Sequence, residues 1–191
     1  MKKVILVFVV SLLLAGCATT QFSRLADNQM TLGQSTRQSV EAILGKPLQK
    51  HSVISHGQNI DAISYIYSAP IALGGNVPVK SQTFFFYNNI LVGHNYTNSW
   101  KRETTNFDES KIKQIKEGET NIDEVYSLLG QPGGEQIYPL TENKNEKVAI
   151  YLFYDIKKDF LTIKPTQKTL IVAYSPNTGI VSKATFVSTN E

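Results

Sequence analysis

Hydrophobic residues follow a helical spacing at two places in the chain that lie 85 residues apart. Within 40–44 and again within 125–129, valine, isoleucine and leucine occur at positions i, i+3 and i+4. This spacing puts the apolar side chains on one face of a helix. Ser35 and Thr120 precede the two stretches at positions suited to an N-cap, and a capping-box partner follows three residues later. The pattern predicts two short amphipathic helices.

The two helical stretches belong to a longer internal repeat. Residues 33–47 align without a gap on residues 118–132. Each copy ends in Gly-x-Pro, where the glycine accepts the left-handed conformation that stops a helix and the proline prevents its continuation. The residues shared by the copies are Gly33, Val40, Leu44, Gly45 and Pro47 in the first and Gly118, Val125, Leu129, Gly130 and Pro132 in the second. We interpret them as the structural motif of a tandem repeat.

After each Gly-x-Pro the pattern changes from helical to extended. Aromatic and β-branched residues dominate the runs that follow, as they do in strands. The expected strands are 49–56, 62–68, 81–88 and 90–97 in the first half and 135–138, 147–156, 169–175 and 180–187 in the second. A shorter helix is expected ahead of each main one, at 27–32 and 108–116. The sequence therefore predicts an α+β protein of two tandem ααβββ(β) domains, at 30–104 and 105–191, each a helix pair packed on an antiparallel sheet.

The N-terminus combines a basic start with a short apolar run. Lys2 and Lys3 precede an apolar run over 4–14, which is shorter than the roughly 20 residues that a membrane-spanning helix needs. These features fit a secretory signal. The run leads into Leu14-Ala15-Gly16-Cys17, which resembles the lipobox of bacterial lipoproteins. The alternative is an ordinary signal peptide that happens to contain a cysteine.

The lipobox resemblance implies a processing route. The residues that signal peptidase would recognise are Leu14, Ala15 and Gly16. Residues 1–16 would be removed as the signal peptide, and Cys17 would carry diacylglycerol and an N-acyl chain at the start of a short tether over 17–29. Because two acyl chains already anchor a protein stably, three would hold it on its membrane. Ala18 after the cysteine favours the outer membrane of a Gram-negative bacterium, with the domains on its periplasmic face.

The repeated Gly-x-[Ser/Thr]-x₄-Val-x₃-Leu-Gly-x-Pro stretch, followed by aromatic strands, resembles the SmpA/OmlA (BamE) family of outer-membrane lipoproteins. The most specific parts of the resemblance are 33–47 and 118–132, beside Cys17. It implies an ααβββ fold, which also occurs in the tandem halves of the beta-lactamase inhibitory protein. BamE proper carries one such domain and stabilises the machine that inserts β-barrels into the outer membrane, whereas this chain carries two copies.

Charge and cysteine content exclude several kinds of partner and site. The chain has 19 Lys and Arg against 16 Asp and Glu, a formal net charge of +3. Removing Lys2 and Lys3 with the signal leaves 17 basic residues and a charge of +1, which does not indicate a nucleic-acid-binding surface. The single cysteine rules out a disulfide framework and a multi-cysteine metal site.

The chain shows no constellation that indicates catalysis or cofactor binding. His51, His56 and His94 all lie in expected strands, and the first two fall on opposite faces of an ideal strand, so their spacing does not suit a metal site. Gly74-Gly75 and Gly133-Gly134 lack the lysine and helix of a phosphate loop and are better interpreted as turns. We expect no catalytic residue, metal, cofactor or small-molecule substrate.

Two long loops occupy matching places in the repeat. Residues 69–78 and 157–165 each join the second and third strands of a half, and they exceed the usual two to five residues of a hairpin loop. Because loops are rarely buried, apolar residues in them suggest contact with a partner. The candidate partner-binding residues are Ile71, Leu73, Val77, Phe160 and Leu161. The alternative is that the loops fold back over the sheet edge.

These features predict a non-enzymatic outer-membrane lipoprotein that acts as a binding or scaffold module in cell-envelope or outer-membrane protein assembly. Its partners would be envelope proteins, β-barrel assembly components among them, and a lipid anchor would hold it on the membrane. The alternative is a protein inhibitor of a periplasmic or extracellular enzyme, by analogy with the beta-lactamase inhibitory protein. An envelope enzyme is a third hypothesis, which the lack of a reactive constellation disfavours.

Overall fold

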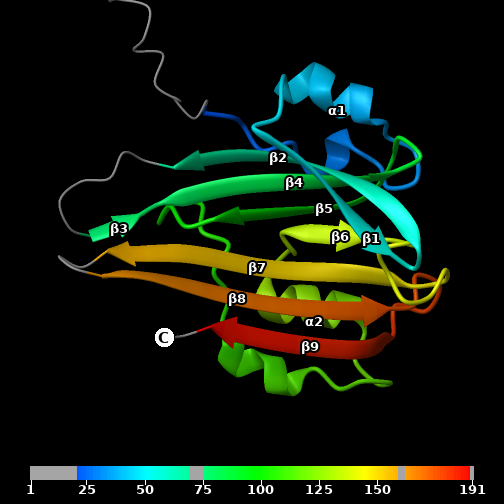
Figure 1. Cartoon of the computed structure of the whole chain (residues 1–191). Coiled ribbons are helices and arrows are strands. Elements are labelled where there is room, and N and C mark those ends of the chain that lie inside the picture. The colour runs from blue at the N-terminus through cyan, green and yellow to red at the C-terminus, as the bar shows by residue number, and fades with distance from the viewer. Residues whose placement is uncertain (1–20, 69–74, 159–161, 190–191) are drawn as a thin grey trace, which may run out of the picture.

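The computed structural model describes residues 21–68, 75–158 and 162–189. In each half of the chain, two short helices are followed by a run of strands (Figure 1). In chain order, with η for a 3₁₀ helix, the elements are η2 (Asp27–Gln29), α1 (Arg37–Leu44), β1 (Gln49–Ser55), β2 (Gln58–Ser68), β3 (Gly75–Val77), β4 (Val79–Tyr87), β5 (Ile90–Asn98), η3 (Glu109–Gln114), α2 (Ile122–Leu129), β6 (Gly134–Gln136), β7 (Lys147–Lys158), β8 (Ile163–Tyr174) and β9 (Val181–Thr189).

The described strands form one antiparallel sheet that crosses both halves of the chain. Its hydrogen-bonded order is β1-β2-β4-β5-β6-β7-β8-β9, and β3 pairs with β7 beside this path. The halves join where β5, the last strand of the first half, pairs with β6, the first strand of the second, and where β3 pairs with β7. The expectation of two ααβββ(β) domains, each with a sheet of its own, is therefore wrong, because one sheet runs through the molecule (Figure 1).

Two glycines explain how the halves share a sheet. Gly134 lies opposite Asn95 in the β5–β6 pair, and the Tyr96 amide donates to the Gly133 carbonyl at 2.8 Å. A Cβ on Gly133 would collide with the Tyr96 carbonyl oxygen, and a Cβ on Gly134 would collide with that of His94. This glycine pair is therefore a site of close backbone approach between strands rather than a simple turn.

Within the described residues, each half has one α-helix and a shorter 3₁₀ helix in place of the expected helix pair. α1 and α2 have eight residues each, whereas η2 has three and η3 has six. The N-caps are Thr36 and Asn121, whose side chains accept from the amides of Ser39 and Asp123. Each N-cap thus lies one residue after the predicted one, Ser35 or Thr120.

The two α-helices end in the same way. Gly45 and Gly130 are the C-caps, with φ of 77° and 84°, a conformation that a residue with a Cβ rarely adopts. Pro47 and Pro132 follow two residues later and are buried, so the chain turns into the sheet at once. The first strand of each half therefore starts close beneath its helix.

Both helices cover the same face of the sheet. Cross-strand partners share a face, and the register runs from Phe84 through His94 and Glu135 to Ala149. Phe84 belongs to the core under α1, and Ala149 belongs to the core under α2. We call this the helix side and the opposite face the open face.

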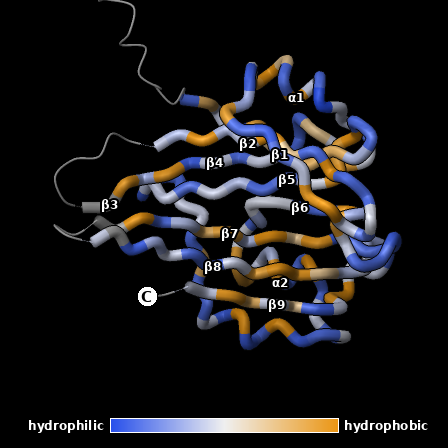
Figure 2. Tube along the Cα trace, in the orientation of Figure 1, coloured by the Kyte–Doolittle hydropathy of each residue, from blue (hydrophilic) through white to orange (hydrophobic). Residues whose placement is uncertain are grey.

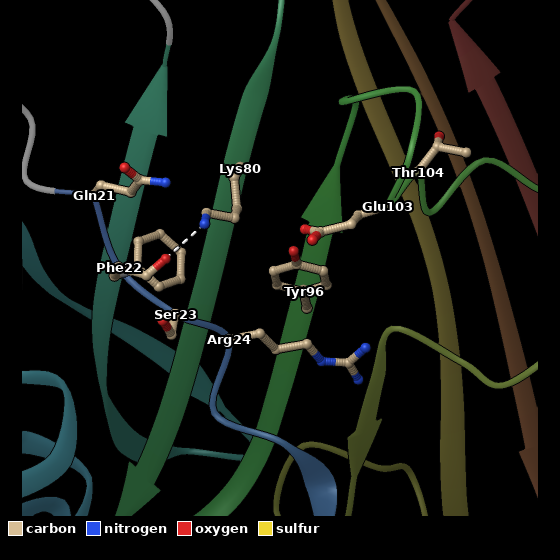
Figure 3. A pocket seen from close by; sticks show the side chains of 8 residues that line it. All are labelled: Gln21, Phe22, Ser23, Arg24, Lys80, Tyr96, Glu103 and Thr104. Atoms are coloured by element: carbon tan, nitrogen blue, oxygen red, sulfur yellow. Dashed lines mark hydrogen bonds between the residues drawn. The ribbon is translucent and has the colours of Figure 1, made fainter.

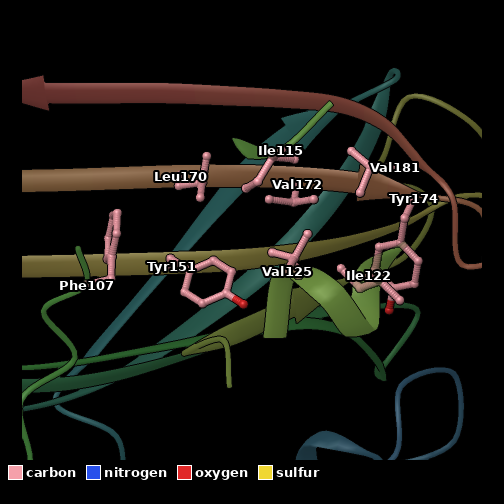
Figure 4. Packing of buried hydrophobic residues seen from close by; sticks show 10 residues of the cluster. Phe107, Ile115, Ile122, Val125, Tyr151, Leu170, Val172, Tyr174 and Val181 are labelled. Atoms are coloured by element: carbon pink, nitrogen blue, oxygen red, sulfur yellow. The ribbon is translucent and has the colours of Figure 1, made fainter. Parts of the chain in front are cut away.

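Two hydrophobic clusters fill the helix side. In the first half, Val40 of α1 packs with strand residues such as Ile63 and Phe84. In the second half, the side chains of Val125 and Ile122 of α2 meet those of the sheet (Figure 4). The second cluster consists of Phe107, Ile115, Ile122, Val125, Ala149, Tyr151, Leu170, Val172, Tyr174 and Val181.

The halves also repeat individual backbone contacts. The Gly33 amide donates to the Leu91 carbonyl at 2.8 Å, and the Gly118 amide donates to the Val181 carbonyl at the same distance. Both glycines have positive φ, 78° and 80°. The turn before each α-helix is therefore held to the last hairpin of its half by an equivalent bond.

Candidate functional site

The open face is the largest surface of the sheet that no described helix covers. Its members are the strand residues that alternate with the two helix-side clusters, as the cross-strand register defines them. They include Ser64, Ile66, Ser81, Thr83, Phe85, Asn95, Thr97, Gln136, Val148, Ile150, Leu152, Tyr154, Gln167, Thr169, Ile171, Ala173, Lys183, Thr185 and Val187. In Figure 2, continuous hydrophobic stretches run along parts of β7 and β8, so apolar residues fall on both faces of the sheet there.

The open face has very little charge. By register, the face holds two formally charged strand residues, Lys158 of β7 and Lys183 of β9. The Nζ of Lys183 lies 3.6 Å from Oε1 of Glu142. Strand residues on the helix side carry many more charges. They include Lys50, Asp61, Lys80, Glu135, Lys147, Asp155 and Lys168. Charge is depleted at the centres of protein–protein interfaces, so the open face has the composition of such a centre.

Apolar side chains on the open face are accessible at β8 and β9. Ile171 is 41% exposed and Val187 is 58% exposed, although both lie within strands. Leu152 and Tyr154 of β7 and Phe85 of β4 are half-buried on the same face. Val148, Ile150 and Ala173 form a small buried cluster there, against which Leu152 packs. This surface offers apolar contact area together with uncharged hydroxyl and amide groups.

The segment between β6 and β7 covers one end of the open face. The Ser55 hydroxyl donates to the Pro139 carbonyl at 2.6 Å, and the Ile137 amide donates to the Val92 carbonyl at 2.9 Å. A Cβ on Gly93 would collide with the side chain of Leu140, which therefore lies directly over β5. The accessible part of the face is thus shifted toward the other end of the strands.

The structure places few of the predicted partner-binding residues. Ile71, Leu73, Phe160 and Leu161 lie outside the described residues, and so do Leu14, Ala15, Gly16 and Cys17. Val77 lies in β3, is 9% exposed and pairs with Ile156 of β7, so it is a buried strand residue rather than an exposed loop residue. The open-face residues Ile171 and Val187 were not singled out from the sequence, where only strand alternation marks them.

A groove opens on the helix side, beside the start of the described chain (Figure 3). It is a cavity of about 830 Å³ between the N-terminal segment 21–24, strands β4 and β5, and residues 103–104. The Lys80 ammonium donates to the Phe22 carbonyl at 2.6 Å and lies 5.0 Å from the centre of the Phe22 ring. This lysine fixes the N-terminal segment to the sheet.

Three other polar side chains of the groove, those of Arg24, Tyr96 and Glu103, also have partners. The Arg24 guanidinium lies 4.8 Å from the centre of the Tyr96 ring and forms an ion pair with Asp27 at 3.1 Å. The side-chain amide of Asn98 donates to the Tyr96 hydroxyl at 2.8 Å and to Oε2 of Glu103 at 3.2 Å. Burial raises the pKa of Tyr96, so its hydroxyl stays protonated. The arrangement is one of structural hydrogen bonds rather than of a nucleophile beside a base.

His94 is the most perturbed ionisable group near the groove. Its side chain is buried, and Nε2 lies 3.9 Å from Oδ1 of Asp27. Burial lowers the pKa of His94 to about 4, and the Asp27 charge opposes this shift only in part. The ring is therefore neutral at pH 7. Within 21–68, 75–158 and 162–189, no three His, Cys, Asp or Glu residues come close enough together to hold a metal ion.

Comparisons with known proteins add little to this picture. No family model matches the chain, and no curated protein sequence matches it. Among solved structures, the chain is similar to a "putative beta-lactamase inhibitor protein" from Streptococcus mutans, with 13% identity, a TM-score of 0.43 and coverage of 80% of this chain and 82% of that chain. A likeness this weak carries no argument about function. In the described part of the chain, no helix has the length and apolar character to cross a membrane.

Proposed function

We propose that this chain is a non-enzymatic, lipid-anchored module that binds another protein of the cell envelope through its open face. The observation that carries the proposal is the separation of charge between the two faces of the sheet. Two charged strand residues, Lys158 and Lys183, fall on the open face by register, and Glu142 pairs with Lys183. Burying this face against a partner therefore desolvates few charges while removing apolar surface from water.

The proposed location is the periplasmic face of the outer membrane of a Gram-negative bacterium. The lipobox-like Leu14-Ala15-Gly16-Cys17 supports an anchor of diacylglycerol and an N-acyl chain on Cys17. The acyl chains are covalent groups, and the proposal includes no cofactor, nucleic acid or small-molecule substrate. A binding module held in this way meets its partner at high local concentration, because both are confined to one membrane region.

Two classes of partner fit this surface. The resemblance of 33–47 and 118–132 to the SmpA/OmlA (BamE) motif supports a role in outer-membrane protein assembly, with β-barrel assembly components as partners. An exposed sheet face with few charges also suits a protein inhibitor that covers the active site of a periplasmic or extracellular enzyme. The first class predicts a partner resident in the membrane, and the second predicts a soluble one-to-one complex.

A site-specific crosslinking experiment tests the proposal. A photoreactive amino acid replaces Ile171 or Val187 on the open face, or the exposed Lys113 of η3 on the helix side as a matched control. Crosslinks in intact envelopes, identified by mass spectrometry, are expected from the two open-face positions and not from the control. Barrel-assembly components would identify an assembly role, and an enzyme inhibited by the purified protein would identify an inhibitor. Crosslinks from the control position alone would overturn the proposal.

A further inference from the structure

A second exposed surface surrounds the turn at the end of α1. Ile43 and Leu48, on either side of Gly45, are 56% and 53% exposed. Both line a cavity of about 800 Å³ that is also lined by Gln21, the first described residue, and by Lys46 within the turn. Two large apolar side chains therefore lie beside the point where the N-terminal segment enters the fold.

The repeat provides an internal comparison for this turn. The positions 85 residues later are Leu128, Gln131 and Gly133, in place of Ile43, Lys46 and Leu48. Leu128 is half-buried and Gly133 is buried, so the second copy lacks the exposed apolar pair as well as the lysine. Because the second copy builds the same helix end without them, the fold does not require these exposed residues, and a contact outside the fold accounts for them better.

An aromatic and basic cluster lies on the other side of Gln21. Gln21 and Trp100 both line a cavity of about 600 Å³, and the Trp100 ring stacks on Tyr67 with centroids 5.5 Å apart. Lys101 and Arg102, which follow the tryptophan, are exposed and line the same cavity. Tryptophan is enriched where apolar and aqueous layers of a membrane meet, and lysine and arginine interact there with anionic headgroups.

The distance to the proposed anchor brings both surfaces close to the membrane. Cys17 precedes Gln21 by four residues. Four residues of fully extended chain span at most about 14 Å. A lipidated Cys17 would therefore hold Gln21, and the two surfaces on either side of it, within that distance of the headgroup layer.

We propose that Ile43, Leu48 and Trp100 insert into the interface of the membrane that holds the anchor, with Lys46, Lys101 and Arg102 beside anionic headgroups. This inference rests on the lipid anchor of the proposed function but not on its protein partner. The tether makes the contact effectively intramolecular, so a modest affinity of the surface for lipid suffices to occupy it. The result is a fixed orientation of the sheet relative to the membrane rather than a freely tumbling domain.

Trp100 is the single tryptophan of the chain and reports directly on this contact. The lipidated protein is reconstituted into vesicles of phosphatidylethanolamine and phosphatidylglycerol that carry bromine near the glycerol end of an acyl chain. We expect Trp100 emission to shift to the blue and to be quenched. Combining Ile43→Ser with Leu48→Ser should reduce the quenching at least twofold. Ile54→Ser is the matched control, because Ile54 is 81% exposed on β1, near the β1–β2 hairpin, and should leave the quenching unchanged.

Vesicle flotation separates failure of the anchor from failure of this inference. If the lipidated chain does not float and behaves like Cys17→Ser, the anchor is refuted and the membrane contact is refuted with it. If the chain floats while Trp100 is not quenched, the membrane contact alone is refuted. Equal quenching in the double variant and in Ile54→Ser would also overturn the assignment of Ile43 and Leu48. Circular dichroism verifies that each variant is folded.

Discussion

The Tyr65 hydroxyl donates a hydrogen bond of 2.7 Å to the carbonyl oxygen of Gly45, the residue that ends α1. The second half repeats the bond, from Tyr151 to Gly130, at 2.8 Å. Burial raises the pKa of Tyr65 to about 12, and burial raises that of Tyr151 as well, so both phenols remain donors at neutral pH. In each half, a strand tyrosine thus fixes the C-terminal end of the helix to the sheet.

Removing one of these hydroxyls should destabilise the protein without changing its shape. Tyr151→Phe leaves the ring in the core but deprives the Gly130 carbonyl of its donor. We expect the free energy of unfolding to fall by about 1 kcal/mol in urea titrations followed by circular dichroism. Tyr154→Phe, on the open face, is the control and should change the value by less than about 0.5 kcal/mol. Equal stability of the two variants would contradict a role for the Tyr151 bond.

A methyl group at the junction between the halves should be far more damaging. In Gly134→Ala the new Cβ meets the backbone of β5 at the carbonyl of His94, where no flexible side chain can move aside. We expect a loss of about 3 kcal/mol or more in the free energy of unfolding. The control is Gly57→Ala, at a hairpin turn where a Cβ has open space but φ is positive, which should cost about 1 kcal/mol. A Gly134→Ala protein as stable as wild type would show that the β5–β6 pairing is wrong.

Stability should fall as the pH is lowered from neutrality toward 4 because of His94. Its pKa in the folded protein, about 4, lies below the ordinary value of 6.5, so the unfolded chain binds the proton more tightly. The free energy of unfolding therefore decreases as pH falls through this window, by up to about 3 kcal/mol. His94→Gln should flatten the dependence between pH 6.5 and 4, whereas a substitution of the exposed His51 should not. Parallel pH profiles for wild type and His94→Gln would refute this prediction.

Introducing a charged side chain on the open face should weaken partner binding while leaving the fold intact. Ile171→Arg and Val187→Arg place a guanidinium where the proposed interface excludes water, at positions that are 41% and 58% exposed in the free protein. We expect at least a tenfold weaker complex with the partner recovered by crosslinking, and a change in unfolding free energy below about 0.5 kcal/mol. Lys113→Glu on the helix side is the control. Unchanged affinity in both open-face variants would place the binding surface elsewhere.

The sequence predicted the local elements better than their arrangement. The spacing within 40–44 and 125–129 located both α-helices, because apolar periodicity and a following glycine are local properties. The single sheet could not be predicted in this way, because the pairing of β5 with β6 depends on a backbone approach at Gly133 and Gly134 that the sequence expresses only as two small residues. Pairing between distant segments is a tertiary property, and a glycine pair is equally typical of a turn.

The candidate site was missed for a related reason. Alternation along β7 separates Tyr151 and Phe153 from Leu152 and Tyr154, but it does not say which set faces a helix. In the structure, Tyr151 belongs to the core under α2, so the set that contains Tyr151 faces the helix. The apolar residues of the two long loops were predicted to bind a partner instead, and one of them, Val77, is buried in β3.

Gly133 and Gly134 also have a mechanical consequence. The β5–β6 and β3–β7 ladders, which join the two halves, contain three residue pairs each, whereas the β7–β8 ladder contains twelve. Two side-chain bonds supplement them: the Thr97 hydroxyl accepts from the Tyr154 amide, and the Thr105 hydroxyl donates to the Leu152 carbonyl. Tension that passes across the sheet from the N-terminal segment to β9 must cross these short ladders. Under an applied force, we therefore expect the backbone pairing in the middle of the sheet to break before the long β7–β8 ladder does.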